Sequence, residues 1–578
     1  MNEFFERLKQ RKLVQWALAY AAASFALLQG IDIVANRFDW PQQAIRFVIL
    51  MMIVGFFVTL VLAWYHGERG AQRVTGTELL ILAVLLTIGG GFLWRFSGTS
   101  RQDNVTSSSA VSIPKKSVAV LPLVNTSGDP SNEYFSDGLS EELIAVLARI
   151  PDLKVIGRSS SFLFKGQRSD SAAIGEKLGV AHLIEGSVRK QGDRVRIVAE
   201  LINAADGRSI WSETYDRELK DVFAVQTEIA RSVAEQMKVK LLGETLSSIP
   251  AGRSENPVAH NAVLRADFYL QQETPETVRR AITFLQEAIR LDPNYALAYA
   301  KLAAAWRRYA ASFSTEATDD TVKAYAQARS AAEMAVSLAP NLTETRMAVG
   351  LQAMNPDLDF RAAEKEFRRV VESAPSDAAA KNGLSMALSS QGRLTEADQI
   401  CREVILLDPL LTTSWYNIGR VAVGLGHYKE AEELFKKGLE IQPHAARFHS
   451  YLVILDILEN RPEQAMANAQ LESEGFWRDY ALNLVQQAQG GRSVGDAMLK
   501  DFIARYSDTG AFQIAVLYAV RKEPDEMFRW LDTAYATRDS GLTQLAVTPF
   551  FLPYVNDPRF VTLCQKLSVR LPSASAKQ

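Results

Sequence analysis

The fold is decided by one stretch in the second half of the chain, LLTTSWYNIGRVAVGLGHYKEAEELFKKGLEIQP, residues 410–443. Apolar residues recur in it at helical spacing, and Gly426 divides it into two helical segments. Comparable units end on prolines whose last three steps are 35, 34 and 34 residues: Pro293, Pro340, Pro375, Pro409 and Pro443. Twelve residues before each proline stands an alanine, a residue small enough to let two helices approach closely: Ala281, Ala328, Ala363, Ala397 and Ala431.

A helix-turn-helix unit that recurs about every 34 residues is typical of tetratricopeptide repeats. The quoted unit resembles that family at six of its positions: Trp415, Gly419, Gly426, Tyr428, Ala431 and Phe435. The first proline step is 47 residues, which predicts an insertion at Ser312 to Asp320. We therefore expect an all-α superhelical solenoid of about five repeats over 256–445. Degenerate repeat-like helices and a cap over 446–567 and a tail over 568–578 should follow it, with Phe550, Phe551 and Phe560 covering the last repeat.

Stacked repeats create a concave surface, normally lined by the first helix of each repeat. In the clearest unit Tyr416 and Arg420 are spaced i,i+4, so they share one helix face, where we expect them to be exposed. The preceding unit offers Asn382 and Met386. These four residues are the candidates for binding a peptide or helix of a protein partner. The alternative is an ordinary solvated helix face.

Three apolar runs open the chain, at residues 13–34, 47–65 and 79–96, each close to the length that crosses a bilayer. Four basic residues precede the first run: Arg7, Lys9, Arg11 and Lys12. By the positive-inside rule we expect a three-span anchor over 1–96 in a bacterial inner membrane, with a cytoplasmic N-terminus and periplasmic soluble domains. The third run contains Gly89, Gly90 and Gly91. If it does not span, the soluble domains would be cytoplasmic.

A Ser-rich flexible linker is expected over 97–114, and an α/β domain over 115–244. Its predicted strands are 117–124, 153–157, 181–188, 195–202 and 209–215, and its predicted helices are 137–149, 171–178 and 222–242. Gly192-Asp193 and Asp206-Gly207 lie where hairpin turns belong, and Gly179 closes the second helix.

Three blocks of this domain resemble the TolB-like domain of bacterial proteins: SVAVLPLVNTSGDPSNEYFSDGLSEELIAVLARI, VIGRSSSFLFKG and IGEKLGVAHLIEGSVRKQGDRVRIVAELINAADGRSIWSETYDREL. The block FFERLKQRKLVQWALAYAAASFALLQ resembles the membrane segment that often precedes it. In other family members the domain follows an adenylate cyclase domain or a winged-helix DNA-binding domain. Only about 12 residues precede the first apolar run here, so the resemblance implies kinship with the non-catalytic part of such proteins.

The sequence contains no recognised catalytic motif. Ser159, Ser160 and Ser161 lack a G-x-S-x-G context, and Glu141 and Glu142, being adjacent, point in different directions on a helix. No Walker A or G-x-G-x-x-G sequence and no zinc-ligand spacing occur, so we expect no cofactor, no metal and no small-molecule substrate. Two distant cysteines disfavour disulfides, and a net charge of -2 disfavours nucleic acid.

These patterns predict a multidomain protein that is not an enzyme: a scaffold on the lipid bilayer that presents a TolB-like domain and a repeat groove to protein partners. The alternative is a sensory or signal-transduction component related to adenylate cyclases or transcription regulators that contain the same repeats. It would lack their catalytic or DNA-binding domain.

Overall fold

The computed structural model describes residues 113–167, 170–238, 252–272, 274–312, 319–489 and 492–570, together with Tyr20 and Ser24. The three predicted membrane segments, apart from those two residues, lie outside the described part, as do most of the linker and tail. Within the described ranges no helix is long and apolar enough to span a bilayer. The chain divides into two compact units, Met1–Ser112 and Ile113–Gln578, and the second is described here.

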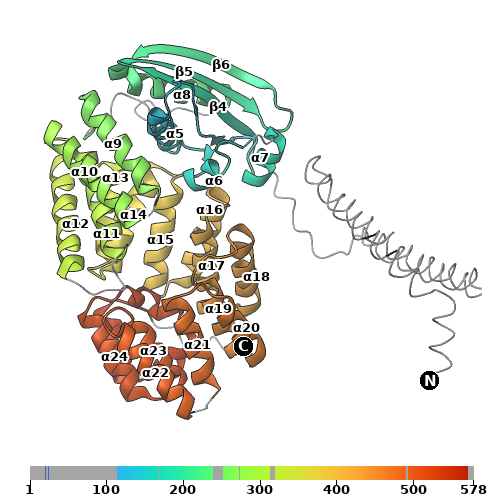
Figure 1. The fold of residues 1–578 in the computed structure, drawn as a ribbon, viewed down its shortest axis with the longest axis vertical. Helices are drawn as coiled ribbons and strands as arrows, with labels where there is room; N and C mark the ends of the chain where they lie inside the picture. The colour runs from blue at the N-terminus through green and yellow to red at the C-terminus, as the bar shows by residue number, and fades with distance from the viewer. Residues whose placement is uncertain are drawn as a thin grey trace, which may run out of the picture. The chain divides into compact units, whose positions relative to one another are not determined.

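A mixed sheet forms the first part of this unit, with strand order β3-β1-β4-β5-β6. Its long strands β4, β5 and β6 lie side by side in Figure 1. The strands are β1 (Ser117–Val120), β3 (Lys154–Val155), β4 (His182–Gln191), β5 (Arg194–Asn203) and β6 (Ser209–Glu218). β1 runs parallel to β3 and β4, whereas β4, β5 and β6 form an antiparallel meander. Its two turns hold Gly192 and Gly207 at φ 59° and 66°, which confirms both predicted hairpins.

Side chains of alternate residues of β1 enter two different cores. Val118 and Val120 pack with helices α5 (Glu133–Leu147) and α8 (Val222–Gln236), while Ala119 faces the opposite side with α7 (Ser171–Leu178). The predicted end of α7 is confirmed, because Gly179 follows it with φ 62°. The result is a sheet covered by helices on both faces.

Some predicted boundaries in this domain were wrong. The strand predicted over 117–124 ends at Val120, and β2 (Val124–Asn125) pairs separately with β4, because Pro122 between them has no N–H to donate to a ladder. The first helix begins four residues early, after a turn capped by Asp129. A short helix, α6 (Arg158–Phe162), was not predicted.

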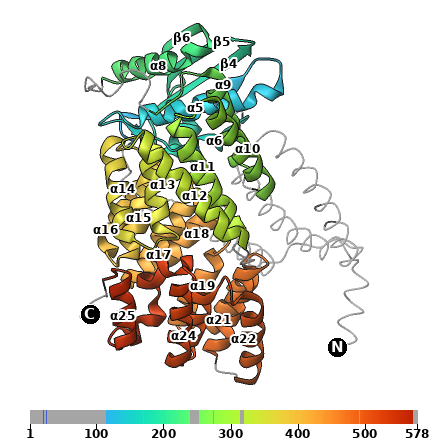
Figure 2. The same cartoon turned by 90° about the vertical axis from the view of Figure 1, so that its left-hand side faces the viewer.

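Eight helix pairs follow in the described part of the chain, stacked one after another (Figure 2). They are α9 (Pro257–Leu270) with α10 (Pro275–Leu291), α11 (Ala296–Ser312) with α12 (Asp319–Leu338), α13 (Thr343–Met354) with α14 (Phe360–Ser373), α15 (Ala378–Ser390) with α16 (Leu394–Leu407), α17 (Thr412–Leu425) with α18 (Tyr428–Ile441), α19 (Phe448–Leu458) with α20 (Pro462–Leu471), α21 (Phe476–Ala488) with α22 (Arg492–Tyr506), and α23 (Ala511–Val520) with α24 (Pro524–Ala536). The predicted insertion lies between α11 and α12, and residues 313–318 of it lie outside the described part.

The helices interlock through glycine and aromatic residues. An added Cβ at Gly419 would overlap the ring of Phe435, and Gly350 and Gly383 contact Phe367 from two sides in the same way. Phe367 and Phe435 are fully buried. Gly419, the family glycine in α17, therefore leaves the space that the Phe435 side chain of α18 fills.

The C-terminal segment comprises two 3-10 helices, η4 (Ser540–Val547) and η5 (Pro549–Tyr554), and α25 (Pro558–Lys566). It was expected to cover the last repeat, and Phe551 does pack edge-to-face against Phe512 of α23, with ring centroids 5.7 Å apart. However, the segment also runs back along the array: the Arg570 backbone N–H donates to the Gln391 carbonyl at 2.8 Å. It therefore covers several repeats and not only the last.

Candidate functional site

The first pair of predicted groove residues is buried, so the prediction that they are exposed was wrong. Tyr416 and Arg420 are each only 6% exposed. The Tyr416 ring packs against Phe435, Phe448 and Tyr451, with centroid distances of 5.4–6.5 Å. The Arg420 guanidinium lies 5.4 Å from the Tyr416 ring centroid. Spacing of i,i+4 placed the two on one face correctly, but it could not show that aromatic residues of the next repeat cover that face.

The second pair, on α15, is half-buried. Asn382 accepts a hydrogen bond at 2.9 Å from the amide of Asn417 on α17, which ties neighbouring inner helices together. Met386 packs at the edge of the main hydrophobic core of the array. Partner binding by these four residues stays a prediction.

The chain itself covers part of the inner face, at the C-terminal ends of α15 and α17. Ser390, at the end of α15, donates to the Thr543 carbonyl at 2.9 Å, and the Tyr451 hydroxyl donates to Gln544 at 2.8 Å. A Cβ added to Gly424 of α17 would lie 3.1 Å from the Val547 Cα, so the backbone of η4 passes directly over that helix. No local pattern in the sequence could have revealed this return, because it joins residues more than 90 positions apart.

The α/β domain is joined to the array through the turns between repeats. Asp408, just after α16, accepts hydrogen bonds from the Ser160 backbone N–H at 2.8 Å and from its hydroxyl. The same hydroxyl oxygen accepts from the Leu410 N–H at 2.8 Å, and the Gly157 N–H donates to the Leu407 carbonyl at 2.7 Å. Burial raises the pKa of Asp408, and the bonds from Ser160 oppose that rise. Ser160, which lacks any catalytic context, is thus part of a structural junction.

A second junction lies on α5. As predicted, Glu141 and Glu142 point in different directions: Glu141 pairs with Arg158 at 2.9 Å, and Glu142 pairs with Arg253 at 2.9 Å. Gln226 also donates to Glu142, and His260 lies 3.6 Å from it. Burial disfavours the charged carboxylate, but His260 and Arg253 outweigh that effect and lower the pKa of Glu142.

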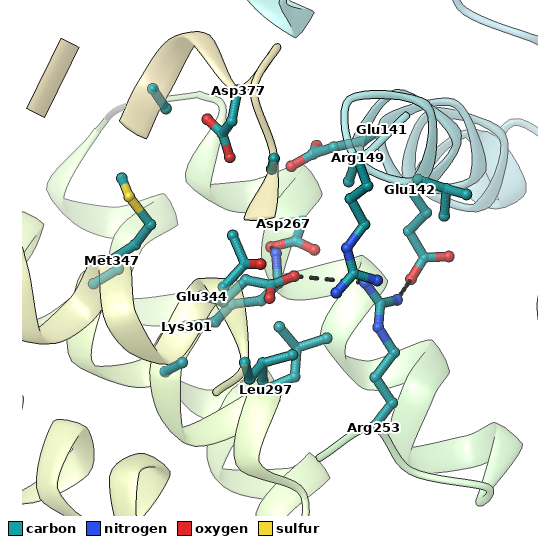
Figure 3. Close-up of a pocket in the computed structure, with 18 of the residues that line it drawn as sticks. Glu141, Glu142, Arg149, Arg253, Asp267, Leu297, Lys301, Glu344, Met347 and Asp377 are labelled. Atoms are coloured by element: carbon teal, nitrogen blue, oxygen red, sulfur yellow. Dashed lines mark hydrogen bonds and ion pairs between the residues drawn. The ribbon is translucent and has the colours of Figure 1, made fainter. Parts of the chain in front are cut away.

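The residues of the second junction also line a pocket of about 360 Å³, which no sequence pattern predicted (Figure 3). Its roof is α5 and its opposite walls are α9, α11, α13 and the start of α15. Five carboxylates and three basic side chains line it: Glu141, Glu142, Asp267, Glu344, Asp377, Arg149, Arg253 and Lys301. Within the described residues no group of three or more His, Cys, Asp or Glu side chains is placed to hold a metal.

Part of this charge is neutralised inside the pocket wall. Asp267 pairs with Lys301 at 2.8 Å. Burial and the neighbouring Glu141 raise the pKa of Asp267 to about 6, although Lys301 opposes them. The pair therefore contributes no net charge toward the hollow near neutral pH, and the electrostatics of the pocket depend on the other groups.

Comparison with known proteins agrees with the repeat architecture. Models of the tetratricopeptide repeat match residues 378–407 and 413–445, which cover the pairs α15–α16 and α17–α18. A search of solved structures also matches a tetratricopeptide repeat protein from Parabacteroides merdae ATCC 43184, with 12% identity, 46% of this chain and 99% of that one covered, and a TM-score of 0.35. Another is YrrB, a TPR protein with an unusual peptide-binding site, with 20% identity, 35% and 92% coverage, and a TM-score of 0.23.

A curated relative is the "Putative adenylate cyclase 3" of Rhizobium meliloti (strain 1021), 35% identical over 214 residues. The match covers 36% of this chain and 36% of that protein, so the chain spans only about a third of its relative's length. The chain therefore carries an α/β region followed by tetratricopeptide repeats, and over about a third of its length it is related to a protein described as a putative adenylate cyclase.

Proposed function

We propose that this chain is a non-catalytic component of a bacterial inner membrane whose repeat array recognises a protein partner. The observation that carries the proposal is the array itself: residues from α13 to α25 share one continuous hydrophobic core, with the two matched repeats near its beginning. Such arrays bind peptides and helices along the inner helices. In this proposal the α/β domain is TolB-like, and the N-terminal apolar runs hold the protein at the bilayer, with the domains in the periplasm.

We infer that the partner competes with the chain's own C-terminal segment. The η4 segment lies on α15 and α17, where a bound peptide would lie. Half-buried Met386 can be changed with less damage to the core than Tyr416 or Arg420, which are buried.

Crosslinking capture with the full-length protein tests this site. Met386→Glu should reduce capture of the partner that wild type retains, because a charge would enter its apolar contact surface. Leu406→Glu is the matched control, since Leu406 is 49% exposed on an outer helix, α16. If both variants capture the partner equally well, the proposal that the inner face binds the partner is wrong.

A second candidate, a sensory component, is favoured by the relationship to a putative adenylate cyclase and by the charged pocket between the α/β domain and the array. Purified protein that forms cyclic nucleotides from ATP or GTP would overturn the non-catalytic assignment. A reporter fused at Gln578 tests the topology, and activity of a cytoplasm-specific reporter would reject the periplasmic placement.

A further inference from the structure

The pocket under α5 has walls from elements that are distant in sequence. α5 supplies the roof, and α11, α13 and the first turn of α15 supply the opposite side. Figure 3 shows Arg149, two residues beyond the end of α5, with Asp377 and Met347 on other sides of the hollow. A molecule bound here would touch both the α/β domain and the array.

Two groups at the rim have charges that the protein leaves uncompensated. The Arg149 guanidinium makes no ion pair or side-chain hydrogen bond within the described part of the chain. Asp377 accepts the N-cap bond from the Ala380 N–H at 2.9 Å, but no basic side chain among the described residues pairs with it. One free cation and one free anion therefore face the same hollow.

The remaining charges favour a ligand that brings a positive group. Glu344 has only a long contact of 3.5 Å with Arg253, which is already paired more closely with Glu142 at 2.9 Å. Burial raises the pKa of Asp377, and the charge of Glu344 adds to the rise. A bound ammonium group would relieve both effects, because an opposite charge stabilises a carboxylate.

Apolar side chains line the rest of the pocket: Leu297, Ala300, Leu342, Met347, Ala348 and Leu351. The volume of about 360 Å³ is at the lower end of the range for small-molecule sites, which suits a compact ligand. A compact molecule with an ammonium group, a carboxylate and an apolar part matches this lining, because each of its parts finds an oppositely charged or an apolar partner.

We propose that this pocket binds a free α-amino acid with an apolar side chain, its carboxylate on Arg149 and its ammonium group on Asp377 and Glu344. Arginine suits the carboxylate because its planar guanidinium can donate two parallel hydrogen bonds. The apolar side chain lies on the lining of Leu297, Met347 and Leu351. Because the walls belong to two structural parts, occupancy also ties the α/β domain to the array.

Calorimetric titration of the purified full-length protein tests the proposal, with the twenty common amino acids screened first and L-leucine as the reference probe. Two analogues separate the charges: L-leucinamide lacks the carboxylate, and 4-methylpentanoate lacks the amine. Each should bind about ten-fold or more weakly than L-leucine, because each loses a charge-assisted hydrogen bond.

The variants should reproduce these losses selectively. Arg149→Met should weaken L-leucine by about ten-fold or more yet leave leucinamide binding nearly unchanged. Asp377→Asn should weaken L-leucine while leaving 4-methylpentanoate nearly unchanged, and asparagine still serves as an N-cap. The matched controls are Arg189→Met, on the exposed surface of β4, and Asp359→Asn, the N-cap of the neighbouring helix α14.

Hydrogen exchange gives a second readout that does not depend on affinity. Bound L-leucine should slow exchange both in α5 and at the start of α15, because it contacts both. The proposal is overturned if no amino acid binds, if both analogues bind as tightly as L-leucine, or if protection appears elsewhere. Equal effects of Asp377→Asn and Asp359→Asn would likewise remove the assigned role of Asp377.

Discussion

At the scale of single residues, the hydroxyl of Ser160 joins the α/β domain to the array through two hydrogen bonds. It donates to Asp408 and accepts from the Leu410 N–H. Ser160→Ala should therefore cost about 1–3 kcal/mol, because the buried Asp408 carboxylate and the Leu410 N–H each lose a partner. Ser161→Ala is the control: Ser161 is equally buried in α6, but its hydroxyl has no partner within the described residues. Urea unfolding followed by fluorescence should show a lower midpoint for the first variant alone.

His260 should make the stability of the folded protein depend on pH. It is buried beside Glu142, Arg253, Lys301 and Tyr295, and burial lowers its pKa below 6.5. Between that lowered value and 6.5 the unfolded chain binds a proton that the folded chain does not, so His260 reduces stability as pH falls below 6.5. Above 6.5 both states are neutral there and the effect vanishes. The thermal midpoint of His260→Gln should therefore fall less than that of wild type between pH 7 and 5; parallel curves would contradict this.

At the scale of elements, the glycine in α17 is a packing residue. Gly419→Ala should destabilise the array by about 1–3 kcal/mol, because the methyl group would overlap buried Phe435. This exceeds the gain in helix propensity of about 1 kcal/mol that alanine brings. Gly495→Ala in α22 is the milder control, since an added Cβ would come no closer than 3.0 Å to the Gln487 amide and would meet no ring. Chemical denaturation should show a larger loss of stability for Gly419→Ala than for Gly495→Ala. If Gly419→Ala is more stable than wild type, the close packing of Gly419 against Phe435 is not what stabilises this repeat.

The same elements show how far sequence reasoning reaches. Pro409 and Ala431 act locally, so the recurrence of such prolines and alanines about every 34 residues predicted the helix pairs correctly. Gly179 and Gly207 mark turns by conformations that L-residues rarely adopt, and those turns were also found. No sequence pattern marks Arg149 and Asp377 as lining one pocket, because their positions relative to each other depend on how the α/β domain packs on the array. No local sequence pattern therefore predicts the pocket, although the helices on both of its sides were predicted.

At the scale of the whole molecule, the C-terminal segment holds several repeats together. Val547 is 1% exposed where η4 crosses α17. Val547→Asp should lower the free energy of unfolding by about 3 kcal/mol or more, because it buries a charge with no partner. Leu552→Asp, at a position 46% exposed in η5, should change it by less than about 0.5 kcal/mol. If the segment is a cover for the inner face, hydrogen exchange in Val547→Asp should rise in α15 and α17 before it rises in the sheet. If hydrogen exchange instead rises equally in the sheet and the array, the segment unfolds together with the whole unit and is not a separate cover.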